Sequence, residues 1–590
     1  MDRPIHSNDH ALAHDTEKTT STSSHSLEGL EAHAGVQTVE TAQKVYGRYS
    51  KWFLFVSLGL AAYVYSLDGT TTWNYLAFAT SAFKDHSTIS TIAVAQSVII
   101  SCGKPVIAKV ADVGSRGTAY FAVLVFYVIG YIIIASAKNI GTVGGGIIIY
   151  AVGYTGLQLL QEIVIADNST LKWRGVVSSL MTTPFIINAF VGSNVAANVL
   201  KGVGWRWGYG MFAILVPAAL TPLIVTLLWA EHKARRIRKT EISAPVQKLP
   251  FGRRAWNVIE KLDVLGLLLL AASVCLILLP LTLAKKARNG WHNPSIIAMV
   301  VIGCLLVPTF AFYEAKVAKY PVVPGRFLRN RSVVIASLIG FFDFVSFYIT
   351  SVYLYSFVIV VKDWSLLNST YFSQTQTVAL CVFGFTAGLV QRFIHRAKPM
   401  LVIGLAIRLL GCGLMIHSRG ANASDVEIVW SQILQGMGGG FTAVANQVSA
   451  QASVPHVDVA MVTAVVLLVT EIGGAIGNAI AGAIWTSLMP QKMTKHLSFL
   501  SDAQRAELYG SLTTAAANPR GDPIREGVIM AYGDVMRILC IVATIFAIPP
   551  LLLSLFMPNW YLGDQQNAVE KVDLAGRKIA DEDTEGKSAL

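Results

Sequence analysis

The chain has 590 residues, of which 53% are hydrophobic and only 14% are charged, whereas about 25% of residues in a typical soluble protein are charged. Apolar runs of about 20 residues, long enough to cross a bilayer as a helix, recur along it, which excludes a soluble globular protein and predicts many membrane spans. The net charge of +12 does not indicate nucleic acid binding, because the basic residues cluster in short loops between the apolar runs, as membrane topology requires.

Residues 1–46 are rich in Ser, Thr, His and acidic residues, so we expect a disordered tail, and no cleavable signal peptide is evident. Fourteen apolar segments follow, and we interpret each of them as a membrane-spanning helix. They are residues 50–80, 89–108, 118–137, 142–165, 176–200, 207–229, 263–284, 295–314, 333–361, 371–391, 399–417, 427–450, 459–488 and 531–557.

The distribution of basic residues among the loops predicts the orientation of the chain. Loops 231–261, 315–332 and 392–398 are rich in Lys and Arg, and all three lie on one side if there are fourteen spans. Loop 362–370, on the other side, holds one lysine, and the basic cluster at 285–288 is an exception to the pattern. Because basic loops remain in the cytosol, we expect both termini to be cytosolic.

Four carboxylates lie inside the predicted spans, where each charge costs roughly 2.5–3.5 kcal/mol on insertion scales. We predict that they line a polar cavity and bind protons in one conformation and release them in another, as proton-driven transport requires. The alternative is a structural ion pair or a hydrogen bond to a neighbouring helix, for which Lys104 and Arg408 are candidate partners. The four carboxylates are Asp68, Glu162, Asp343 and Glu471.

Asp68 lies in the outer half of the first predicted span. Its helical face also carries Tyr65, Thr71, Thr72 and Tyr75, at spacings of −3, +3, +4 and +7. We therefore expect Asp68 to line the cavity on its outward side, where it contacts substrate or receives a proton. The spacing does not choose between these two roles.

The sequence contains none of the motifs that indicate catalysis or ATP hydrolysis. GxxxxGK[ST], HExxH and GxSxG are absent, so we predict that the chain is not an enzyme and that it does not drive transport with ATP. All six cysteines lie inside apolar runs, and no Cys/His group has metal-site spacing, so we expect neither disulfide bonds nor a bound metal. Glycines in stretches such as GMGGGFTA are interpreted as sites of close helix packing.

Between the second and third spans, the stretch AKVADVGSRG (residues 108–117) places Asp112 four residues before Arg116. This stretch resembles the loop signature of the major facilitator superfamily, and the resemblance implies that both residues act as a conformational gate. The stretch WRWGYGMFAI (205–214), at the start of the sixth span, is similar to the fourteen-span proton-coupled branch of that superfamily.

Four longer stretches are similar to fungal siderophore-iron transporters, and the resemblance covers about residues 45–570. It implies an all-α integral membrane protein with the major facilitator fold, two six-helix bundles and two extra helices. It also implies import of ferric siderophores by proton symport across the plasma membrane, with an endosomal location in some members. The stretches are YSLDGTTTWNY (65–75), LQEIVIADNSTLKWRGVVSS (160–179), the residues from GGGFTAVANQ to GAIWT (438–486) and MPNWYLGDQQNAVE (557–570).

Together, the spans and the resemblance predict the order of domains along the chain. The two linker helices separate the bundles, and the long extracellular loop carries an amphipathic surface helix at 498–512. The expected parts are a cytosolic N-terminal tail (1–46), a six-helix bundle (47–230), a basic cytosolic loop (231–262), two linker helices with a cytosolic loop (263–332), a second six-helix bundle (333–557) with the extracellular loop 489–530, and a cytosolic C-terminal tail (558–590).

A ferric hydroxamate carries iron that is already fully coordinated, so the resemblance implies no cofactor and no metal ligand on the protein. The expected partners are the ferric siderophore, protons driven by their gradient, and the lipid bilayer, and we expect a monomer. The cavity needs aromatic walls and polar groups that bind amides, although aromatic residues in membrane spans also serve packing. The candidates are Tyr65, Thr71, Thr72, Trp73, Tyr75, Gln158, Phe344, Tyr348, Tyr353 and Asn478.

Two alternative functions stay open at this stage. A fourteen-span drug/proton antiporter usually carries an arginine in span four and a glycine/proline-rich signature in span five. Here span four (IIIYAVGYTGLQ) has no arginine, and span five (TTPFIINAFVGSNVA) matches the signature weakly. A nutrient sensor with a transporter fold usually has a long structured cytosolic extension, whereas the tails predicted here are short and poor in apolar residues.

Overall fold

The computed structural model describes residues 47–83, 89–113, 115–241, 260, 263–284, 289–421, 423–510, 512–515, 518–565 and 567–569. The first half of the chain forms α2 (Arg48–Ala82), α3 (Ile89–Val113), α4 (Arg116–Ala135), α5 (Ile140–Asn168), α6 (Leu171–Thr182), α7 (Pro184–Lys201), α8 (Trp205–Gly210) and α9 (Phe212–Glu241). The middle of the chain forms α11 (Val264–Leu283), α12 (Pro294–Lys316) and the short α13 (Gly325–Arg329). The second half forms α14 (Arg331–Ser351), α15 (Leu354–Val361), α16 (Leu366–Ile394), α17 (Lys398–Ser418), α18 (Asp425–Ala452), α19 (Val459–His496), α20 (Asp502–Gly510), α21 (Leu512–Ala515) and α22 (Pro523–Leu555).

Helices occupy all fourteen positions that were predicted as spans. Within the described ranges, twelve helical stretches are long and apolar enough by themselves to cross a membrane. The other two predicted spans are α11, whose apolar part Val264–Pro280 is shorter, and α18. The latter carries buried amide side chains, among them Gln432 and Gln435, which lower its hydropathy although they face the interior of the bundle.

Three predicted spans are interrupted. The span 176–200 is divided between α6 and α7, because Pro184 lacks an N–H group and fits only the first turn of the second helix. The span 207–229 is divided between α8 and α9 at Met211. The span 333–361 is divided between α14 and α15, which leaves Val352 and Tyr353 between them.

The long loop before the last predicted span is shorter than the predicted range of 489–530. α19 continues to His496, and α22 begins at Pro523, where the side chain of Asp522 accepts a hydrogen bond from Ile524 N and caps the helix. The predicted surface helix at 498–512 is present as α20, which α21 follows. The prediction placed the helix correctly and misplaced the loop boundaries, because helices extend beyond their apolar parts when caps and polar turns stabilise them.

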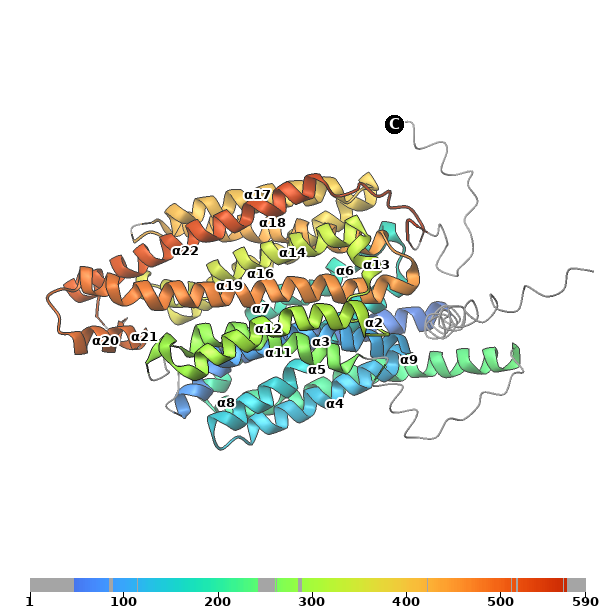
Figure 1. Ribbon diagram of the computed structural model, residues 1–590, viewed down its shortest axis with the longest axis horizontal. Helices are drawn as coiled ribbons and strands as arrows, with labels where there is room; N and C mark the ends of the chain where they lie inside the picture. The colour runs from blue at the N-terminus through green and yellow to red at the C-terminus, as the bar shows by residue number, and fades with distance from the viewer. Residues whose placement is uncertain are drawn as a thin grey trace, which may run out of the picture.

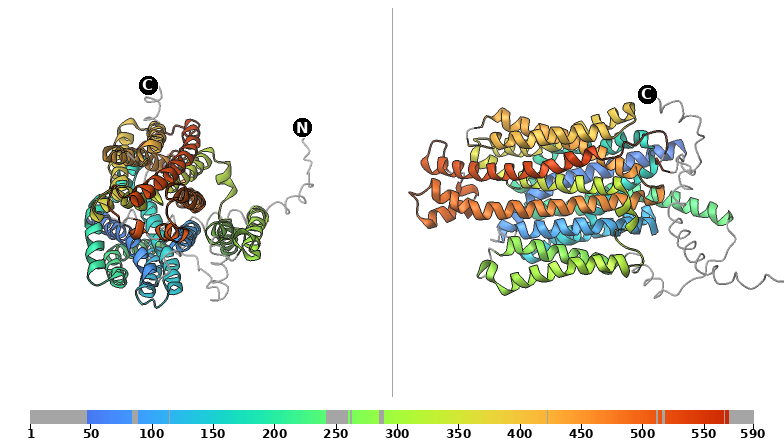
Figure 2. Two further views of the ribbon diagram at one scale, coloured as in Figure 1. Left: turned by 90° about the vertical axis from the view of Figure 1, so that its left-hand side faces the viewer. Right: turned by 45° about the horizontal axis from the view of Figure 1, so that its top comes forward.

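The long helices run roughly parallel to one another in a single bundle (Figures 1 and 2). The two halves meet where α3 packs against α19 and where α16 packs against α6 and α7. α11 and α12 pair with each other at the side of the bundle, and α11 also contacts both α3 and α19. We call the end where α2 begins and α22 finishes the terminal end, and the end that carries α20 the loop end (Figure 1).

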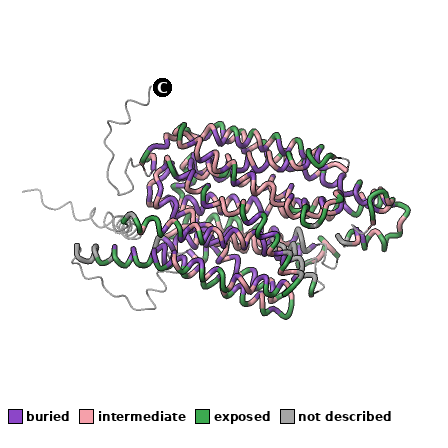
Figure 3. The backbone as a smooth tube through the Cα atoms, turned by 180° about the vertical axis from the view of Figure 1, so that it is seen from behind, coloured by how far each residue is buried: buried purple, intermediate pink, exposed green. Residues whose placement is uncertain are grey.

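Large apolar side chains cover the outer faces of the long helices. Phe121 and Ile132 on α4 are 57% and 53% exposed, and Leu305 and Phe312 on α12 are 63% and 65% exposed. Figure 3 shows exposed residues along the outside of the bundle and buried residues on its inward faces. Such surfaces are stable in lipid, where no water has to be ordered around them, and they are consistent with a multi-pass membrane protein.

Glycines in the stretch QGMGGGF bring α18 close to two neighbours at once. A Cβ atom on Gly436 would lie 2.4 Å from the carbonyl oxygen of Gln376 on α16, and one on Gly438 would lie 2.5 Å from that of Gly404 on α17. Both distances are too short for any side chain, so α18 fits between α16 and α17 only because these positions lack one. This confirms the packing interpretation of these glycines.

We expect Gly436→Ala to lower the free energy of unfolding by about 1–3 kcal/mol, the usual cost of overpacking a close contact. The backbone of α16 has to move to admit the new methyl group. Thermal unfolding of the purified protein in detergent measures the effect. Gly413→Ala is the matched control, because a Cβ at Gly413 meets nothing within 4 Å; equal melting temperatures for the two variants would contradict the packing role.

Candidate functional site

A cavity of about 620 Å³ lies between the two halves of the bundle. Helices α2, α5 and α6 of the first half contribute to its wall, as do α14 to α19 of the second half. Its lining combines polar and apolar groups: hydroxyl and amide side chains come from α16 and α18, and aromatic rings come from α14 and α15. The polar residues of α16 and α18 are Thr370, Ser373, Gln374, Gln376, Thr377, Thr442, Asn446, Gln447 and Gln451, and the aromatic ones are Phe344, Phe347 and Tyr355.

Glu162 and Asp343 are the two predicted carboxylates that line this cavity. Glu162 lies on α5, and the hydroxyl of Ser178 on α6 donates to its carboxylate, with distances of 3.0 Å and 3.2 Å to the two oxygens. Gln158 and Phe344 also line the cavity, where the sequence analysis placed them. The proton-binding role of Glu162 remains a prediction at this point.

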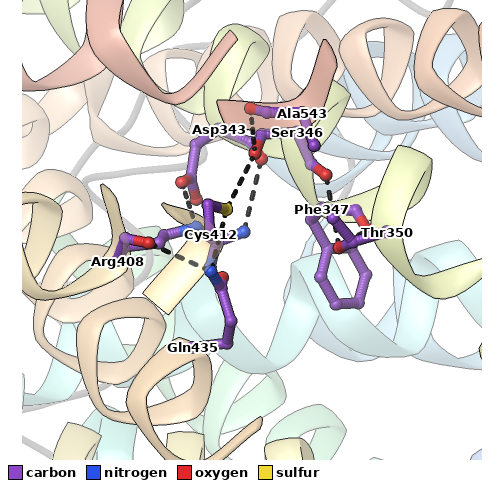
Figure 4. A network of polar contacts seen from close by, with 8 residues as sticks. All are labelled: Asp343, Ser346, Phe347, Thr350, Arg408, Cys412, Gln435 and Ala543. Carbon is purple, nitrogen blue, oxygen red and sulfur yellow. Dashed lines mark hydrogen bonds and ion pairs between the residues drawn. The ribbon is translucent and has the colours of Figure 1, made fainter. Parts of the chain in front are cut away.

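Asp343 is paired with an arginine inside the second half. Arg408 Nε lies 2.5 Å from Asp343 Oδ1, and both side chains are at least 90% buried. Figure 4 shows how neighbouring groups hold this pair: Gln435 Nε2 donates to the backbone oxygen of Arg408 and to Cys412 Sγ, at 3.0 Å and 2.8 Å. Ser346 Oγ donates to Ala543 O at 2.9 Å. The ion-pair alternative therefore describes Asp343 correctly.

Gly439 makes room for this arginine. A Cβ atom at that position would lie 2.8 Å from Arg408 Nη1. Gly439 thus leaves space for the guanidinium at the cavity wall, whereas Gly436 and Gly438 allow close helix packing.

Glu471 pairs with Lys104 across the boundary between the halves. Lys104 Nζ on α3 lies 2.9 Å from Glu471 Oε1 on α19, and the lysine side chain is fully buried. The cavity lining contains neither residue. The pair therefore joins the two halves in a low-dielectric interior, where each charge depends on the other.

Asp68 does not line the cavity, which corrects the expectation of an outward-side cavity residue. Its side chain is fully buried, and its carboxylate accepts hydrogen bonds from the hydroxyls of Tyr127, Tyr131 and Tyr150, the last at 2.8 Å. Three donors satisfy the hydrogen-bonding capacity of a carboxylate that is buried away from water. The i, i+4 spacing of Tyr127 and Tyr131 was a signal for this cage, because it places both hydroxyls on one face of α4.

The remaining candidates around Asp68 and Glu471 also lie outside the cavity lining. The hydroxyls of Thr71 and Thr72 turn back to the carbonyl oxygens of Leu67 and Asp68, at 2.8 Å and 2.9 Å. Four of the candidates are tyrosines whose rings pack against other aromatic rings. The pairs are Tyr65 with Tyr154, Tyr75 with Tyr209, Tyr348 with Phe344 and Tyr353 with Trp485. Packing, the alternative weighed for aromatic residues in spans, is what the structure shows for these four rings.

Asn478 and Trp73 complete the predicted cavity residues. Asn478 lies on α19 outside the cavity lining. Trp73 lies on α2, and its side chain falls outside the described part of the structure. The cavity residues of α16 and α18 were missed, although the run TYFSQTQT in an otherwise apolar span signals a face that avoids lipid.

A charged cluster lies at the terminal end, where the gate was predicted. Arg116 Nε lies 2.9 Å from Asp167 Oδ2, and both side chains are buried. His456, between α18 and α19, belongs to the second half. Its Nε2 lies 3.9 Å from Asp167 Oδ1 in the first half. The side chain of Asp112, in the last turn of α3, lies outside the described part of the structure. Asp167 and His456 were not among the predicted residues, although both fall in stretches that are similar to the family.

The two halves touch directly in the terminal half of the cavity, whose lining continues to Arg174 and Gln451. Ser179 Oγ on α6 donates to the carbonyl oxygen of Gly384 on α16, at 2.8 Å. A Cβ atom on Gly388 would lie 2.6 Å from the carbonyl carbon of Gly175, so the two helices meet with their backbones in contact. Towards the loop end the cavity reaches Thr370, in the second turn of α16.

Comparisons with known proteins agree with this architecture. A family model described as Major Facilitator Superfamily matches residues 58–418. The low affinity heme transporter str3 of Schizosaccharomyces pombe is 36% identical, over 97% of this chain and 92% of the relative. The siderophore transporter fer7 of Mycosarcoma maydis is 37% identical, over 92% and 86%, and the siderophore iron transporter mirC of Emericella nidulans is 35% identical, over 92% and 90%.

Two solved structures share the fold at low sequence identity. The proton:xylose symporter XylE bound to 6-bromo-6-deoxy-D-glucose has a TM-score of 0.50 at 13% identity, over 89% of this chain and 98% of that chain. A bacterial homolog to the human lysosomal transporter Spinster, in an inward-facing and unoccupied conformation, also scores 0.50, at 15% identity over 87% and 98%.

Proposed function

The chain belongs to the Major Facilitator Superfamily, among relatives named as siderophore iron transporters, and on that premise we propose that it imports ferric hydroxamate siderophores by proton symport. The observation that carries the proposal is the cavity between the halves, which combines amide and hydroxyl groups, aromatic rings and one carboxylate held by a serine. The chain is a transporter and the proposal concerns its cargo, its driving ion and its direction.

The chemistry of the cavity wall supports this class of cargo. Its volume of about 620 Å³ is in the range of small-molecule sites. Side chains such as Gln374, Asn446 and Gln447 offer both donors and acceptors to the amide and hydroxamate groups of a siderophore, while Phe344 and Phe347 cover its apolar parts. Iron that arrives fully coordinated needs only these contacts.

Glu162 is the carboxylate best placed to couple protons to this cargo. It faces the cavity and is bonded by the neutral Ser178, whereas Asp343 and Glu471 are each paired with a cation. A proton that binds Glu162 removes a charge that is costly inside the membrane and so favours the conformational change with cargo bound. One proton that crosses 100 mV supplies about 2.3 kcal/mol, which supports about fifty-fold accumulation.

The terminal end is proposed to face the cytosol, because the described basic loops 315–332 and 392–398 lie there. The described contacts of Ser179 with Gly384 and of Gly175 with Gly388 then close the cavity on the cytosolic side. Cargo enters from the loop end and leaves after these contacts separate. The plasma membrane is the proposed location, with an endosomal membrane as the second site.

Uptake of a panel of labelled iron compounds tests the proposal. We expect iron-starved fungal cells that lack their own siderophore uptake to accumulate iron from ferric hydroxamates when this chain is expressed, with faster uptake at acidic external pH. Heme is the competing cargo in the panel, because one relative is named a heme transporter. Cells with an empty vector are the control.

Each alternative predicts a different outcome of the same assay. Preferential uptake of heme would assign the cavity to that cargo. Lower accumulation in expressing cells than in empty-vector cells indicates an exporter. A nutrient sensor accumulates nothing, and its expression changes iron-responsive genes even when transport is absent.

A further inference from the structure

The C-terminal segment, residues 557–565 and 567–569, is anchored to the second half at the terminal end (Figure 1). Leu562 N donates to His395 O at 2.9 Å, and Ala568 N donates to Ala452 O at 3.1 Å. Trp560 Nε1 donates to Ser332 Oγ at 3.1 Å. Leu562 is 1% exposed. This part of the segment is therefore a packed element of the second half.

The same segment also binds the first half, at the beginning of α6. Leu171 N donates to Gln565 O and Lys172 N donates to Gly563 O, both at 3.0 Å. These are first-turn N–H groups, which have no acceptor within their own helix. The N-cap residue Thr170 makes no side-chain capping bond. The segment thus supplies the cap that α6 lacks in its own sequence.

α6 links this cap to the cavity. One turn after its beginning, Gly175 meets Gly388 of the other half. Ser178, on the next turn, holds Glu162, and Ser179 donates to Gly384 across the boundary. A single helix therefore carries the cap, the contact between the halves and the partner of the cavity carboxylate.

We propose that the C-terminal segment is a latch that holds α6 while the cavity is closed at the terminal end and that leaves α6 each time this end opens. The inference rests on the proposed transport function. Opening requires α6 to separate from α16, and the segment bonds to both α6 and the end of α16 at His395. It cannot keep both sets of bonds. The bonds to α6 are the ones that break, because the segment makes more of its hydrogen bonds to the second half and water can replace it at the helix N-terminus.

A reversible crosslink between the latch and α6 tests the proposal in the full chain. The variant carries Lys172→Cys and Asp564→Cys. The hydrogen bond from Lys172 N to Gly563 O brings the two positions together, and in the native chain Lys172 Nζ lies 3.4 Å from Asp564 Oδ2. We expect oxidation to lower ferric siderophore uptake at least tenfold, and reduction to restore it. Peptide mass spectrometry of the oxidised protein gives the fraction crosslinked.

The matched control ties the same segment to its own half. Arg396 and Tyr561 face each other in an antiparallel bridge, a geometry that suits a disulfide. We expect Arg396→Cys with Tyr561→Cys to keep its uptake after oxidation, because this crosslink leaves α6 free to move. Undiminished uptake in the Lys172/Asp564 variant when nearly all molecules are crosslinked would overturn the latch.

A second measurement works without any cargo. Gln391, 2% exposed, lies on α16 against Gly175, so a Gln391→Cys thiol reacts with a maleimide added at the terminal end only when the halves separate there. We expect the Lys172/Asp564 crosslink to slow this labelling at least tenfold; an unchanged rate also overturns the latch. If the wild-type protein takes up no siderophore, but the Lys172/Asp564 crosslink still slows labelling of Gln391→Cys, the proposed function alone has failed.

Discussion

Glu162→Gln is expected to lower the steady-state accumulation of ferric siderophore about fifty-fold at a membrane potential of 100 mV, the contribution of one coupled proton. The glutamine oxygen still accepts the hydrogen bond from Ser178, so the cavity keeps its shape while the titrating group is lost. The stimulation of uptake by acidic external pH should disappear with it. Accumulation ratios at two external pH values measure both effects.

Binding and folding separate this result from general damage. We expect purified Glu162→Gln to bind ferric siderophore about as tightly as the wild type does and to unfold at the same temperature. Glu507→Gln is the matched control, because this substitution makes the same chemical change outside the cavity. Glu507 lies exposed on α20. Full, pH-dependent accumulation by Glu162→Gln would show that another group couples the proton.

Glu471→Gln is expected to destabilise the protein by about 3–5 kcal/mol, because it leaves the fully buried ammonium of Lys104 without its counter-charge. The melting temperature of the purified protein measures this loss. The pair joins α3 to α19, so the loss should appear as separation of the two halves and not as unfolding of one of them. Limited proteolysis between the halves, at loop 231–261, reports that separation.

The double variant Lys104→Met with Glu471→Gln distinguishes an ion pair from a proton site. Removal of both charges restores most of the stability if the pair is structural. A coupling role predicts the opposite pattern: Glu471→Gln keeps its melting temperature and loses the pH dependence of uptake. That outcome would contradict the structural assignment.

The spans were predictable because apolar length and loop charge are local properties. Each of the fourteen predicted segments contains a helix, and the amphipathic surface helix was found as α20. The boundaries of the helices were not predictable in this way, since caps such as Asp522 and a proline such as Pro184 set them independently of hydropathy.

The site was predictable only in part, because helical spacing shows which residues share a face and not what that face meets. Glu162, Asp343, Gln158 and Phe344 were placed in the cavity correctly. Asp68 was placed there on the same kind of reasoning, yet its face meets a tyrosine cage on α4 and α5. Lys104 and Arg408 were recognised as candidate partners of the carboxylates. Lys104 is 367 residues from Glu471, and Arg408 is 65 residues from Asp343, so no local pattern encodes either pair.

The position of α11 has a consequence for the lipid around the protein. This helix contacts α3 and α19, which belong to different halves, through apolar side chains that include Val94, Leu278 and Ala475. It therefore covers the seam between the halves on one side of the bundle. α11 stands between the surrounding lipid and the contact of α3 with α19, and the rocking of the halves that the proposed transport cycle requires would slide it along apolar side chains. The additional helix α11 thus occupies a place at the seam that lipid would fill in a twelve-helix bundle of the same fold.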